Sequence, residues 1–290
     1  MWSTERRSEH TMRGRCHERH HGGSTENRSR LPGGSYLMNE KTIFITGASA
    51  GFGAACARIF SAQGNRLILT ARRSDPLLTL QRELSGKTEV HVIPLDVRDR
   101  VAVKDAVESL PERFRDIDVL INNAGLALGL EPAHKVDLDD WETMVDTNIK
   151  GLMYCTRQIL PGMVARNRGH IVNLGSVAGS WPYPGGNVYG GTKAFVEQFS
   201  LNLRCDLLGT RVRVTCIQPG MAETEFSKVR FKGNEKMASQ VYSGTEALTA
   251  EDIAETIYWV INRPEHVNIN TLELMSIDQA WSPFAVHRRK

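Results

Sequence analysis

The stretch Thr46-Gly47-Ala48-Ser49-Ala50-Gly51-Phe52-Gly53 follows directly on a short apolar run, and it decides the fold. Gly47 permits a tight turn, while Gly51 and Gly53 allow backbone and helix to approach a ligand closely. A helix that begins near Phe52 aims its free N–H groups and its dipole at a phosphate. The order of strand, glycine loop and helix predicts a dinucleotide site with GxxxGxG spacing, and the alternative is an ordinary glycine-rich turn.

Short apolar runs alternate with amphipathic stretches from Thr42 onward. Strands are expected at Thr42–Thr46, Arg66–Ala71, Val90–Leu95, Val119–Asn122, Gly169–Leu174, Arg213–Gln218 and Thr271–Met275. Helices are expected at Ala54–Ser61, Asp75–Leu84, Arg100–Leu110, Trp141–Ala165, Val188–Leu207 and Ala250–Asn262. This alternation predicts an α/β fold: one doubly wound (Rossmann) domain whose seven-stranded parallel sheet carries helices on both faces. Ligands of such sheets bind beyond the carboxyl ends of the strands.

Two arginines end the second expected strand and indicate which nicotinamide cofactor is bound. Enzymes that use NAD place a carboxylate here for the ribose 2′-hydroxyl. The stretch Thr70-Ala71-Arg72-Arg73 contains no acid. A guanidinium binds phosphate oxygens through paired hydrogen bonds, whereas a carboxylate would repel the 2′-phosphate. We therefore predict NADP(H) rather than NAD(H); the alternative is that both arginines are solvated at a helix start.

A second motif, Tyr189-Gly190-Gly191-Thr192-Lys193, places two reactive side chains four residues apart. On a helix this spacing sets both on one face. A phenol has an ordinary pKa of roughly 10, and a nearby ammonium group favours its ionised form. The pair therefore predicts the general acid and base of an oxidoreductase.

The composition is that of one large α/β domain in a chain of 290 residues. No apolar run approaches the roughly 20 residues that span a bilayer, so no membrane segment is expected. The cysteines of the body, Cys56, Cys155, Cys205 and Cys216, are scattered without a CxxC motif. This usage is typical of buried thiols in a reducing compartment, and we expect a cytoplasmic protein. No metal-ligand spacing occurs in the body, and no metal is expected.

Residues 1–37 differ from the rest of the chain. They contain seven Arg and four Glu and hold the whole net charge of +3, because the remaining 29 basic and 29 acidic residues balance. The segment has no hydrophobic periodicity and no apolar core of a secretory signal. We interpret it as a disordered or expression-derived leader, or as a mis-assigned start before Met38, and place the functional domain at residues 38–290. The alternative is an arm that binds nucleic acid or metal; its few aromatics, Trp2 and Tyr36, and its irregularly spaced His residues and Cys16 disfavour this.

The ordered motifs resemble those of the short-chain dehydrogenase/reductase family across residues 41–280. The matching positions are Thr46–Gly53, Asp96-Val97, Asn122-Asn123-Ala124-Gly125, Asn148, Ser176, Tyr189, Lys193, Pro219-Gly220 and Thr224. The resemblance implies a Rossmann fold, bound NADP(H) and reversible interconversion of an alcohol and a carbonyl compound.

The resemblance also implies catalytic roles. Tyr189 gives a proton to the carbonyl oxygen as hydride is delivered, and Ser176 hydrogen-bonds the same oxygen. Lys193 holds the nicotinamide ribose and lowers the pKa of Tyr189, and Asn148 anchors a water on the proton path. The alternative for Ser176 and Asn148 is a capping or turn role. The expected cofactor-binding residues are Gly47, Ser49, Ala50, Gly51, Phe52, Gly53, Arg72, Arg73, Asp96, Val97, Asn123, Ala124, Gly125, Tyr189, Lys193, Pro219, Gly220, Met221 and Thr224.

Three further stretches, Gly125–Gly129, Gly179–Tyr183 and Asn268–Glu273, resemble a subgroup of NADP-dependent 3-hydroxy acid (L-allo-threonine) dehydrogenases and sulfoacetaldehyde reductases. The loop Pro219–Phe226 is one residue shorter than in the 3-hydroxy acid enzymes, and Gln218 replaces a frequent Glu near the expected substrate pocket. The resemblance implies an NADPH-dependent reductase of short anionic aldehydes or ketones, such as sulfoacetaldehyde or malonic semialdehyde. Alternatives are a 3-hydroxy acid, L-allo-threonine or serine dehydrogenase, a 3-oxoacyl-thioester reductase, or a non-catalytic NADP sensor.

An anionic substrate needs a cationic partner. Arg230 and Lys232 follow the expected nicotinamide loop and are candidates, the alternative for each being a solvated surface charge. The glycine and amide groups just before the tyrosine of the second motif can supply further donors. The expected substrate-binding residues are Ser176, Tyr189, Gly186, Asn187 and Arg230.

The family resemblance also implies a homotetramer, packed through the helices around Trp141–Ala165 and Val188–Leu207. The C-terminal segment Trp281–Lys290 is expected to reach a neighbouring subunit's pocket. A small-molecule substrate is the expected partner, with no nucleic acid and no membrane.

Overall fold

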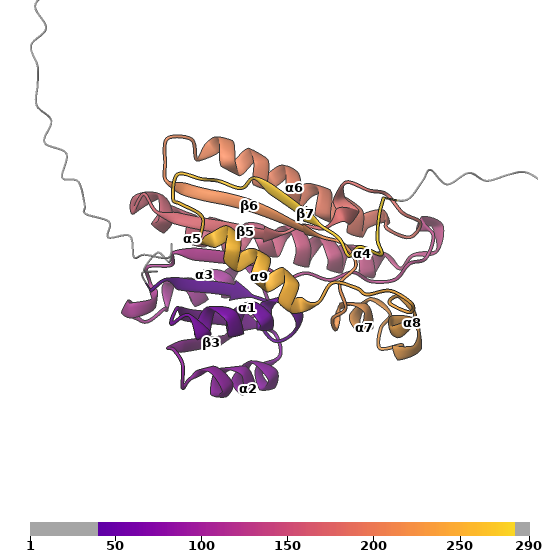
Figure 1. The fold of residues 1–290 in the computed structure, drawn as a ribbon, viewed down its shortest axis with the longest axis horizontal. Helices are drawn as coiled ribbons and strands as arrows, with labels where there is room; N and C mark the ends of the chain where they lie inside the picture. Colours follow the sequence, from indigo (N-terminus) through magenta and orange to yellow (C-terminus); the bar gives the residue numbers. More distant parts are fainter. Residues whose placement is uncertain (1–39, 282–290) are drawn as a thin grey trace, which may run out of the picture. The chain divides into compact units, whose positions relative to one another are not determined.

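Seven parallel strands form the central sheet in the order β3-β2-β1-β4-β5-β6-β7 (Figure 1). The computed structural model describes residues 40–281, so the leader 1–37 and the segment beyond Trp281 lie outside the described residues. The strands are β1 (Thr42–Thr46), β2 (Arg66–Ala71), β3 (Val90–Pro94), β4 (Val119–Asn122), β5 (Gly169–Leu174), β6 (Val212–Pro219) and β7 (Thr271–Leu274). The order reverses between β1 and β4, which is where a doubly wound sheet opens a crevice for a ligand.

Helices cover both faces of this sheet (Figure 1). They are α1 (Gly51–Ala62), α2 (Ser74–Leu84), α3 (Arg100–Glu108), α4 (Leu138–Val145), α5 (Leu152–Ala165), α6 (Asn187–Asp206), α7 (Phe226–Arg230), α8 (Glu235–Gln240) and α9 (Ala250–Ile261). Short helical turns are η1 (Glu112–Phe114), η2 (Ala133–Lys135), η3 (Asp146–Gly151) and η4 (Val177–Gly179). The predicted α/β fold is confirmed.

Alternate side chains of each strand serve two different cores. In β1, Ile43 and Ile45 pack with α1, α2 and α9, whereas Phe44 packs with α3, α5 and α6. All three are fully buried. A strand that is buried on both faces consists almost entirely of apolar residues. The strands can therefore be recognised in the sequence as continuous apolar runs. The two cores hold the carboxyl ends of β1, β4, β5 and β6 in one row.

The expected helix Trp141–Ala165 is present in the structure and contains one π-helical turn. Helix α4 ends at Val145, the wider turn η3 follows as a π-helix, and α5 begins at Leu152. A single π-turn inside a long helix spans too few residues for helical periodicity to reveal it. Helices α7 and α8 were not expected either, because each spans fewer than two helical turns. Within residues 40–281, no helix has the length and apolar character needed to cross a membrane.

Candidate active site

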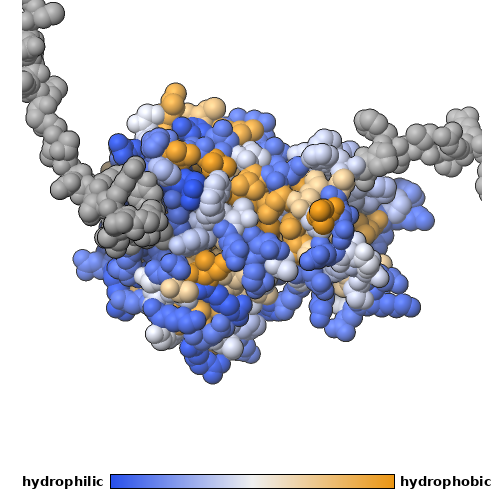
Figure 2. Space-filling view, in the orientation of Figure 1, coloured by the Kyte–Doolittle hydropathy of each residue, from blue (hydrophilic) through white to orange (hydrophobic). Residues whose placement is uncertain are grey.

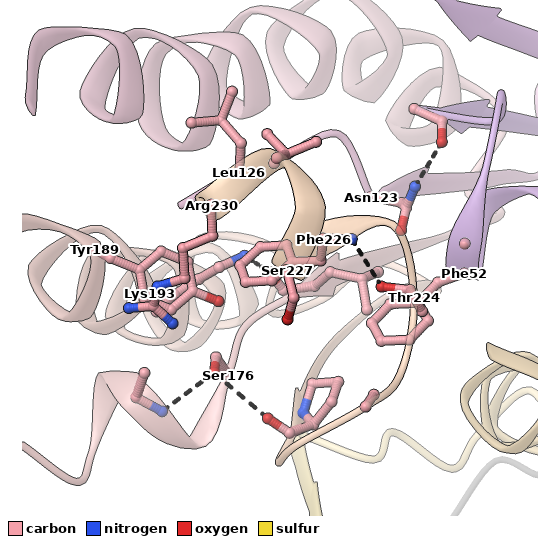
Figure 3. Close-up of a pocket in the computed structure, with 18 of the residues that line it drawn as sticks. Phe52, Asn123, Leu126, Ser176, Tyr189, Lys193, Thr224, Phe226, Ser227 and Arg230 are labelled. Carbon is pink, nitrogen blue, oxygen red and sulfur yellow. Dashed lines mark hydrogen bonds between the residues drawn. The ribbon is translucent and has the colours of Figure 1, made fainter. Parts of the chain in front are cut away.

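A cavity of about 1050 Å³ opens at the carboxyl ends of the strands (Figure 3). Its walls come from the loops that follow β1, β2, β3, β4, β5 and β6, together with α6 and α7. In Figure 3, Tyr189, Lys193 and Arg230 gather at one end, while Phe52 and Thr224 lie at the other. The cavity is therefore long enough to present two chemically different ends to one ligand.

The glycine loop forms one end of the cavity. Gly47 and Gly51 both have positive φ, 67° and 52°, which a side chain with a Cβ adopts only under strain. Helix α1 begins at Gly51; Ala50 makes no side-chain capping bond and the first turn carries no acidic residue. Its leading N–H groups and positive dipole end therefore suit a phosphate. Gly53 has a different role, because a Cβ there would lie 2.5 Å from the carbonyl oxygen of Gly47, so it allows the helix to pack on the loop.

Asn123 fastens the glycine loop to the neighbouring strand. Its side-chain amide donates to the carbonyl oxygens of Thr46 and Gly47 at 2.9 and 3.0 Å. Its backbone N–H and that of Ala124 both donate to the Thr46 hydroxyl. These bonds explain in physical terms why an Asn follows β4: it holds the phosphate loop in shape.

Arg72 and Arg73 line the cavity beyond the end of β2. The Arg73 guanidinium forms a 2.8 Å ion pair with Glu225, and its Nη2 also donates to the hydroxyl of Ser49 at 3.4 Å. Both members of the ion pair are about half exposed. Two guanidinium groups at this corner match a doubly charged phosphate ester better than a neutral hydroxyl.

Asp96 and Val97 line the same end of the cavity, after β3. The Arg98 guanidinium hydrogen-bonds the Asp96 carboxylate, with Nη2–Oδ2 at 2.6 Å, and this holds the pKa of Asp96 below its usual value. The carboxylate is therefore ionised and oriented near neutral pH, and its charge is partly offset by Arg98.

Tyr189 lies on α6 and is almost buried, with 8% of its surface exposed. Burial raises its pKa to about 12, hydrogen bonding to Ser176 opposes this rise, Tyr183 adds to it and Arg230 lowers it. The Ser176 hydroxyl accepts from the Ala178 N–H at 3.1 Å, which fixes it at the start of η4. The phenol is thus protonated near neutral pH and next to an oriented hydroxyl.

Lys193 lies one turn further along α6, with its ammonium 5.8 Å from the centre of the Tyr189 ring. Its Nζ donates to the Leu174 carbonyl oxygen at 2.7 Å, and burial lowers its pKa to about 8. The expectation that Lys193 lowers the pKa of Tyr189 is therefore not met in this structure. The ammonium is drawn to the end of β5 instead, and the cost of burying the phenolate outweighs the nearby cations.

Asn148 lies in η3 and is buried. Its amide donates to the Leu126 carbonyl oxygen at 2.8 Å and to the Thr192 hydroxyl at 3.0 Å, and its Oδ1 accepts from the Leu126 N–H. It thus joins the loop after β4 to the helix that carries Tyr189 and Lys193. The side chain lies behind the cavity wall rather than in it.

Arg230 ends α7 and reaches into the cavity beside Tyr189 (Figure 3). Its Nη2 donates to the Tyr183 hydroxyl at 2.6 Å and its Nε to the Gly129 carbonyl oxygen at 3.3 Å. The guanidinium carbon lies 5.5 Å from the centres of both the Tyr183 and the Tyr189 rings. Within residues 40–281, no carboxylate forms an ion pair with Arg230.

Several expected site residues are not brought to the cavity. Gly53, Asn148, Gly186 and Asn187 are absent from its described lining. The Asn187 amide is already used, because its Oδ1 accepts from the Trp141 indole at 3.0 Å and its Nδ2 donates to the Glu131 carbonyl oxygen. We therefore correct the expectation that Gly186 and Asn187 contact the substrate.

The expectations for Lys232 and Gln218 are also corrected. Lys232 pairs with Asp140 at 2.8 Å and does not line the cavity. Gln218, expected near the substrate pocket, is buried within β6 and also lies outside the described lining. Of the candidate cations, only Arg230 faces the cavity among the described residues.

Other lining residues were not anticipated from the sequence. Tyr242 donates to the Ala222 carbonyl oxygen and contacts the Ser227 hydroxyl, so it braces the loop after β6. Gln279 accepts from the Met221 N–H at 2.6 Å on the opposite side of that loop. Neither belongs to a recognised motif, and a sequence pattern contains no signal for such tertiary contacts.

The family of this chain is identified by comparison with known proteins. The model of the short chain dehydrogenase family matches residues 41–235. The chain is 59% identical over 247 residues to the NADP-dependent 3-hydroxy acid dehydrogenase YdfG of Salmonella typhi, covering 85% of this chain and 99% of the relative. It is 55% identical to sulfoacetaldehyde reductase 2 of Chromohalobacter salexigens, covering 85% and 98%.

Solved structures agree with this comparison. The closed form of a serine dehydrogenase in complex with NADP+ is 56% identical and superposes with a TM-score of 0.83, covering 85% of this chain and 99% of that one. The fold, the glycine loop and the arrangement of Ser176, Tyr189 and Lys193 lead to the same conclusion. The chain belongs to the short-chain dehydrogenase family.

Proposed function

We propose that the protein is an NADPH-dependent oxidoreductase that reduces short anionic aldehydes or ketones to hydroxy acids, reversibly. The observation that carries this proposal is that Tyr189, Ser176, Lys193 and the Arg230 guanidinium line one cavity, and that Arg230 has no carboxylate partner within residues 40–281. An acid, a hydroxyl donor and an anion anchor are the three groups that reduction of an anionic carbonyl compound needs.

The residues around the glycine loop fit NADP(H). The positive end of α1 suits the pyrophosphate, and Arg72 and Arg73 suit the 2′-phosphate. Asp96 and Val97 border the adenine end. Relatives named as NADP-dependent support the same cofactor. When bound, the cofactor supplies the hydride, and the protein supplies orientation and electrostatics.

The catalytic roles follow from the geometry around α6. Tyr189 gives its proton to the carbonyl oxygen during reduction, and Ser176 donates a hydrogen bond to that oxygen as negative charge develops. In this proposal Lys193 binds the nicotinamide ribose; its hydrogen bond to the Leu174 carbonyl oxygen, at the end of β5, supports this role. Asn148 acts as a positioning residue, because it joins α6 to the loop after β4.

Arg230 is the substrate's anion anchor in this proposal. A guanidinium binds a carboxylate or a sulfonate through paired hydrogen bonds, and no carboxylate of residues 40–281 competes for Arg230. Sulfoacetaldehyde and malonic semialdehyde both combine an aldehyde with such a group. The names of the relatives, 3-hydroxy acid dehydrogenase and sulfoacetaldehyde reductase, support this substrate class. The oxidation of 3-hydroxy acids is the same reaction in reverse.

Purified protein tests the proposal directly. NADPH oxidation is followed by absorbance with sulfoacetaldehyde, malonic semialdehyde, an acetoacetyl thioester and a neutral sugar as substrates. We expect kcat/KM for the two short anionic aldehydes to exceed the others at least about tenfold, since a hydrogen-bonded charge contributes about 1.5–3 kcal/mol. Turnover confined to the thioester or the sugar contradicts the proposed substrate class, and NADPH binding without any turnover indicates a sensor.

A substitution locates the anion anchor. Arg230→Ala is expected to raise KM for the anionic aldehydes about 10- to 100-fold and to leave KM for neutral propanal unchanged. Lys228→Ala is the matched control, because Lys228 lies on the same helix and pairs with exposed Glu235. Equal changes for anionic and neutral aldehydes reject Arg230 as the anchor.

We also infer a homo-oligomer in the cytoplasm. Strand β7 is the edge of the sheet and pairs with β6 alone within the described residues. Hydrophobic residues form a band over β7 in Figure 2, whereas the periphery of that face is mostly hydrophilic. An exposed edge next to apolar surface favours a covering partner. The mass in solution, measured by light scattering, tests for the tetramer.

A further inference from the structure

We infer that Arg230, besides anchoring the substrate, makes Tyr189 a stronger acid than burial alone would allow, by placing a permanent positive charge over its ring. The inference rests on the proposed function of Tyr189 as the proton donor. It differs from the role expected for Lys193, whose ammonium is bound to the Leu174 carbonyl oxygen.

The first argument is the position of the guanidinium. Its central carbon lies 5.5 Å from the centre of the Tyr189 ring, closer than the Lys193 ammonium at 5.8 Å. An opposite charge at this range favours the ionised form of a titratable group, typically by 1–3 pKa units at about 4–6 Å. The phenolate that Tyr189 becomes after proton transfer is therefore stabilised by Arg230.

The second argument is that this position is built into the fold. The Tyr183 hydroxyl accepts from Nη2 at 2.6 Å, and the Gly129 carbonyl oxygen accepts from Nε. The Gly129 N–H in turn donates to the Arg230 carbonyl oxygen at 2.9 Å. Two segments, one after β4 and one after β5, thus hold the guanidinium in place, and the first also bonds the Arg230 backbone. Neither Tyr183 nor Gly129 supplies a negative charge that would cancel it.

The third argument concerns the other charges. Among the described residues, the titratable or charged groups that face the Tyr189 phenol are Tyr183, Lys193 and Arg230. The Ser176 hydroxyl, Phe226 and the apolar side chains of the same core complete the surroundings. Lys193 loses its proton at mildly alkaline pH, because burial lowers its pKa to about 8. A guanidinium group keeps its charge under all ordinary conditions, so Arg230 is the lasting source of positive potential beside the phenol.

The consequence is a link between substrate binding and proton transfer. While the anchor is free, its charge pulls the Tyr189 pKa down from the value that burial alone would impose. An anionic substrate bound to Arg230 offsets that charge, so Tyr189 retains its proton in the reducing complex. One residue therefore recognises the substrate and adjusts the acid that reacts with it.

Titration of Tyr189 tests the inference without any turnover. Ionisation of the phenol is followed by ultraviolet difference absorbance after a pH jump, with Tyr189→Phe as the blank for the other tyrosines. Arg230→Gln is expected to raise the pKa of Tyr189 by about one unit, and Arg230→Lys by less, because the charge is kept but held less firmly. The matched control is Lys228→Gln, which removes one exposed charge from the same helix and is expected to leave the pKa unchanged.

The pH profile of kcat for oxidation of a neutral alcohol, 1-propanol, provides a second readout. Oxidation needs the phenolate, so kcat rises with pH through the pKa of Tyr189, and Arg230→Gln should move that rise about one unit upward. Circular dichroism at each pH verifies that the variants are folded. An unchanged pKa in folded Arg230→Gln overturns the inference, even if KM for anionic substrates rises. Absence of turnover in the wild type would instead reject the proposed function and leave the titration to decide on Arg230.

Discussion

Arg73, after β2, forms a 2.8 Å ion pair with Glu225, the residue that precedes α7. Arg73 lies at the corner of the cavity that suits the 2′-phosphate, and Glu225 directly precedes the short helix that ends in Arg230. The ion pair therefore connects this corner to that helix. The guanidinium expected to bind a phosphate therefore has a carboxylate partner in the structure. Any phosphate that binds Arg73 competes with Glu225.

Glu225→Gln is expected to tighten NADPH binding about two- to fivefold, because the variant removes a competitor of the 2′-phosphate. The gain is small since exposed ion pairs contribute only about 0.2–1 kcal/mol. NADH, which lacks that phosphate, should bind unchanged. Fluorescence titration with both cofactors measures the effect, and Glu223→Gln, an exposed carboxylate in the same loop, is the control. A gain of equal size for NADH contradicts the competition.

Arg73→Ala is expected to weaken NADPH binding about tenfold or more and to leave NADH binding within twofold. A hydrogen bond between charged groups contributes about 1.5–3 kcal/mol, and only NADPH offers the second charge. The same titration gives both dissociation constants. If wild-type protein bound NADPH no more tightly than NADH, the assignment of this corner to the 2′-phosphate would be rejected.

Tyr189→Phe removes one hydroxyl and keeps the ring that packs near Phe226. We expect turnover to fall about 10²- to 10⁴-fold, the usual contribution of a positioned general acid. The dissociation constant for NADPH should change less than twofold, because the ring remains. Steady-state kinetics and cofactor titration together check this, and near-normal turnover would refute the role of Tyr189.

Lys193 provides a pH-dependent test of stability. Its pKa is lowered to about 8 by burial, from 10.5, so between these pH values the unfolded chain binds a proton that the folded protein does not. Lys193 by itself therefore contributes an increase in the free energy of unfolding with pH across this window, by up to roughly 3 kcal/mol. Tyr189, Cys56 and Cys155, whose pKa values burial raises, contribute in the opposite direction at alkaline pH, so the contribution of Lys193 is read from a comparison with a variant. Below pH 8 both states are protonated and the contribution no longer changes.

Lys193→Met lacks this titration. The difference in unfolding free energy between wild type and variant is expected to increase in favour of the wild type from pH 8 to pH 10.5. Urea unfolding of the cofactor-free proteins at several pH values measures it. If the free energies of unfolding of wild type and variant changed in parallel with pH, burial would not lower the pKa of Lys193, and the prediction would be wrong.

The adjacent glycines Gly190 and Gly191 separate Tyr189 from Lys193 and should respond in opposite ways to alanine. A Cβ on Gly190 would lie 2.9 Å from the Ala178 carbonyl oxygen in η4, whereas a Cβ on Gly191 meets nothing within 4 Å among the described residues. Gly190→Ala is expected to cost about 1–3 kcal/mol, and Gly191→Ala to stabilise α6 by about 0.5–1 kcal/mol. Thermal unfolding of both variants is the measurement, and equal shifts would contradict the packing.

The sheet, its covering helices and the order of the motifs can all be predicted from the amino-acid sequence. Runs such as Thr42–Thr46 are buried on both sides, and glycine loops and YxxxK spacing are local patterns, so each can be recognised from neighbouring residues alone. Most of the expected cofactor residues, with Ser176, Tyr189 and Arg230, indeed line one cavity. This follows because parallel strands bring their carboxyl ends to the same edge of the sheet.

The contacts between side chains at that edge cannot be predicted from the sequence and are seen in the folded protein alone. The expectation that Asn187 faces the substrate was not met, because its amide is taken by Trp141 and Glu131, which lie 46 and 56 residues away in the chain. Likewise, Lys193 bonds to Leu174, and Arg230 lies over Tyr189. The partners and the pKa of a side chain depend on its burial and on its distances to groups elsewhere in the fold. The spacing of residues along the chain contains no information on these distances or on burial.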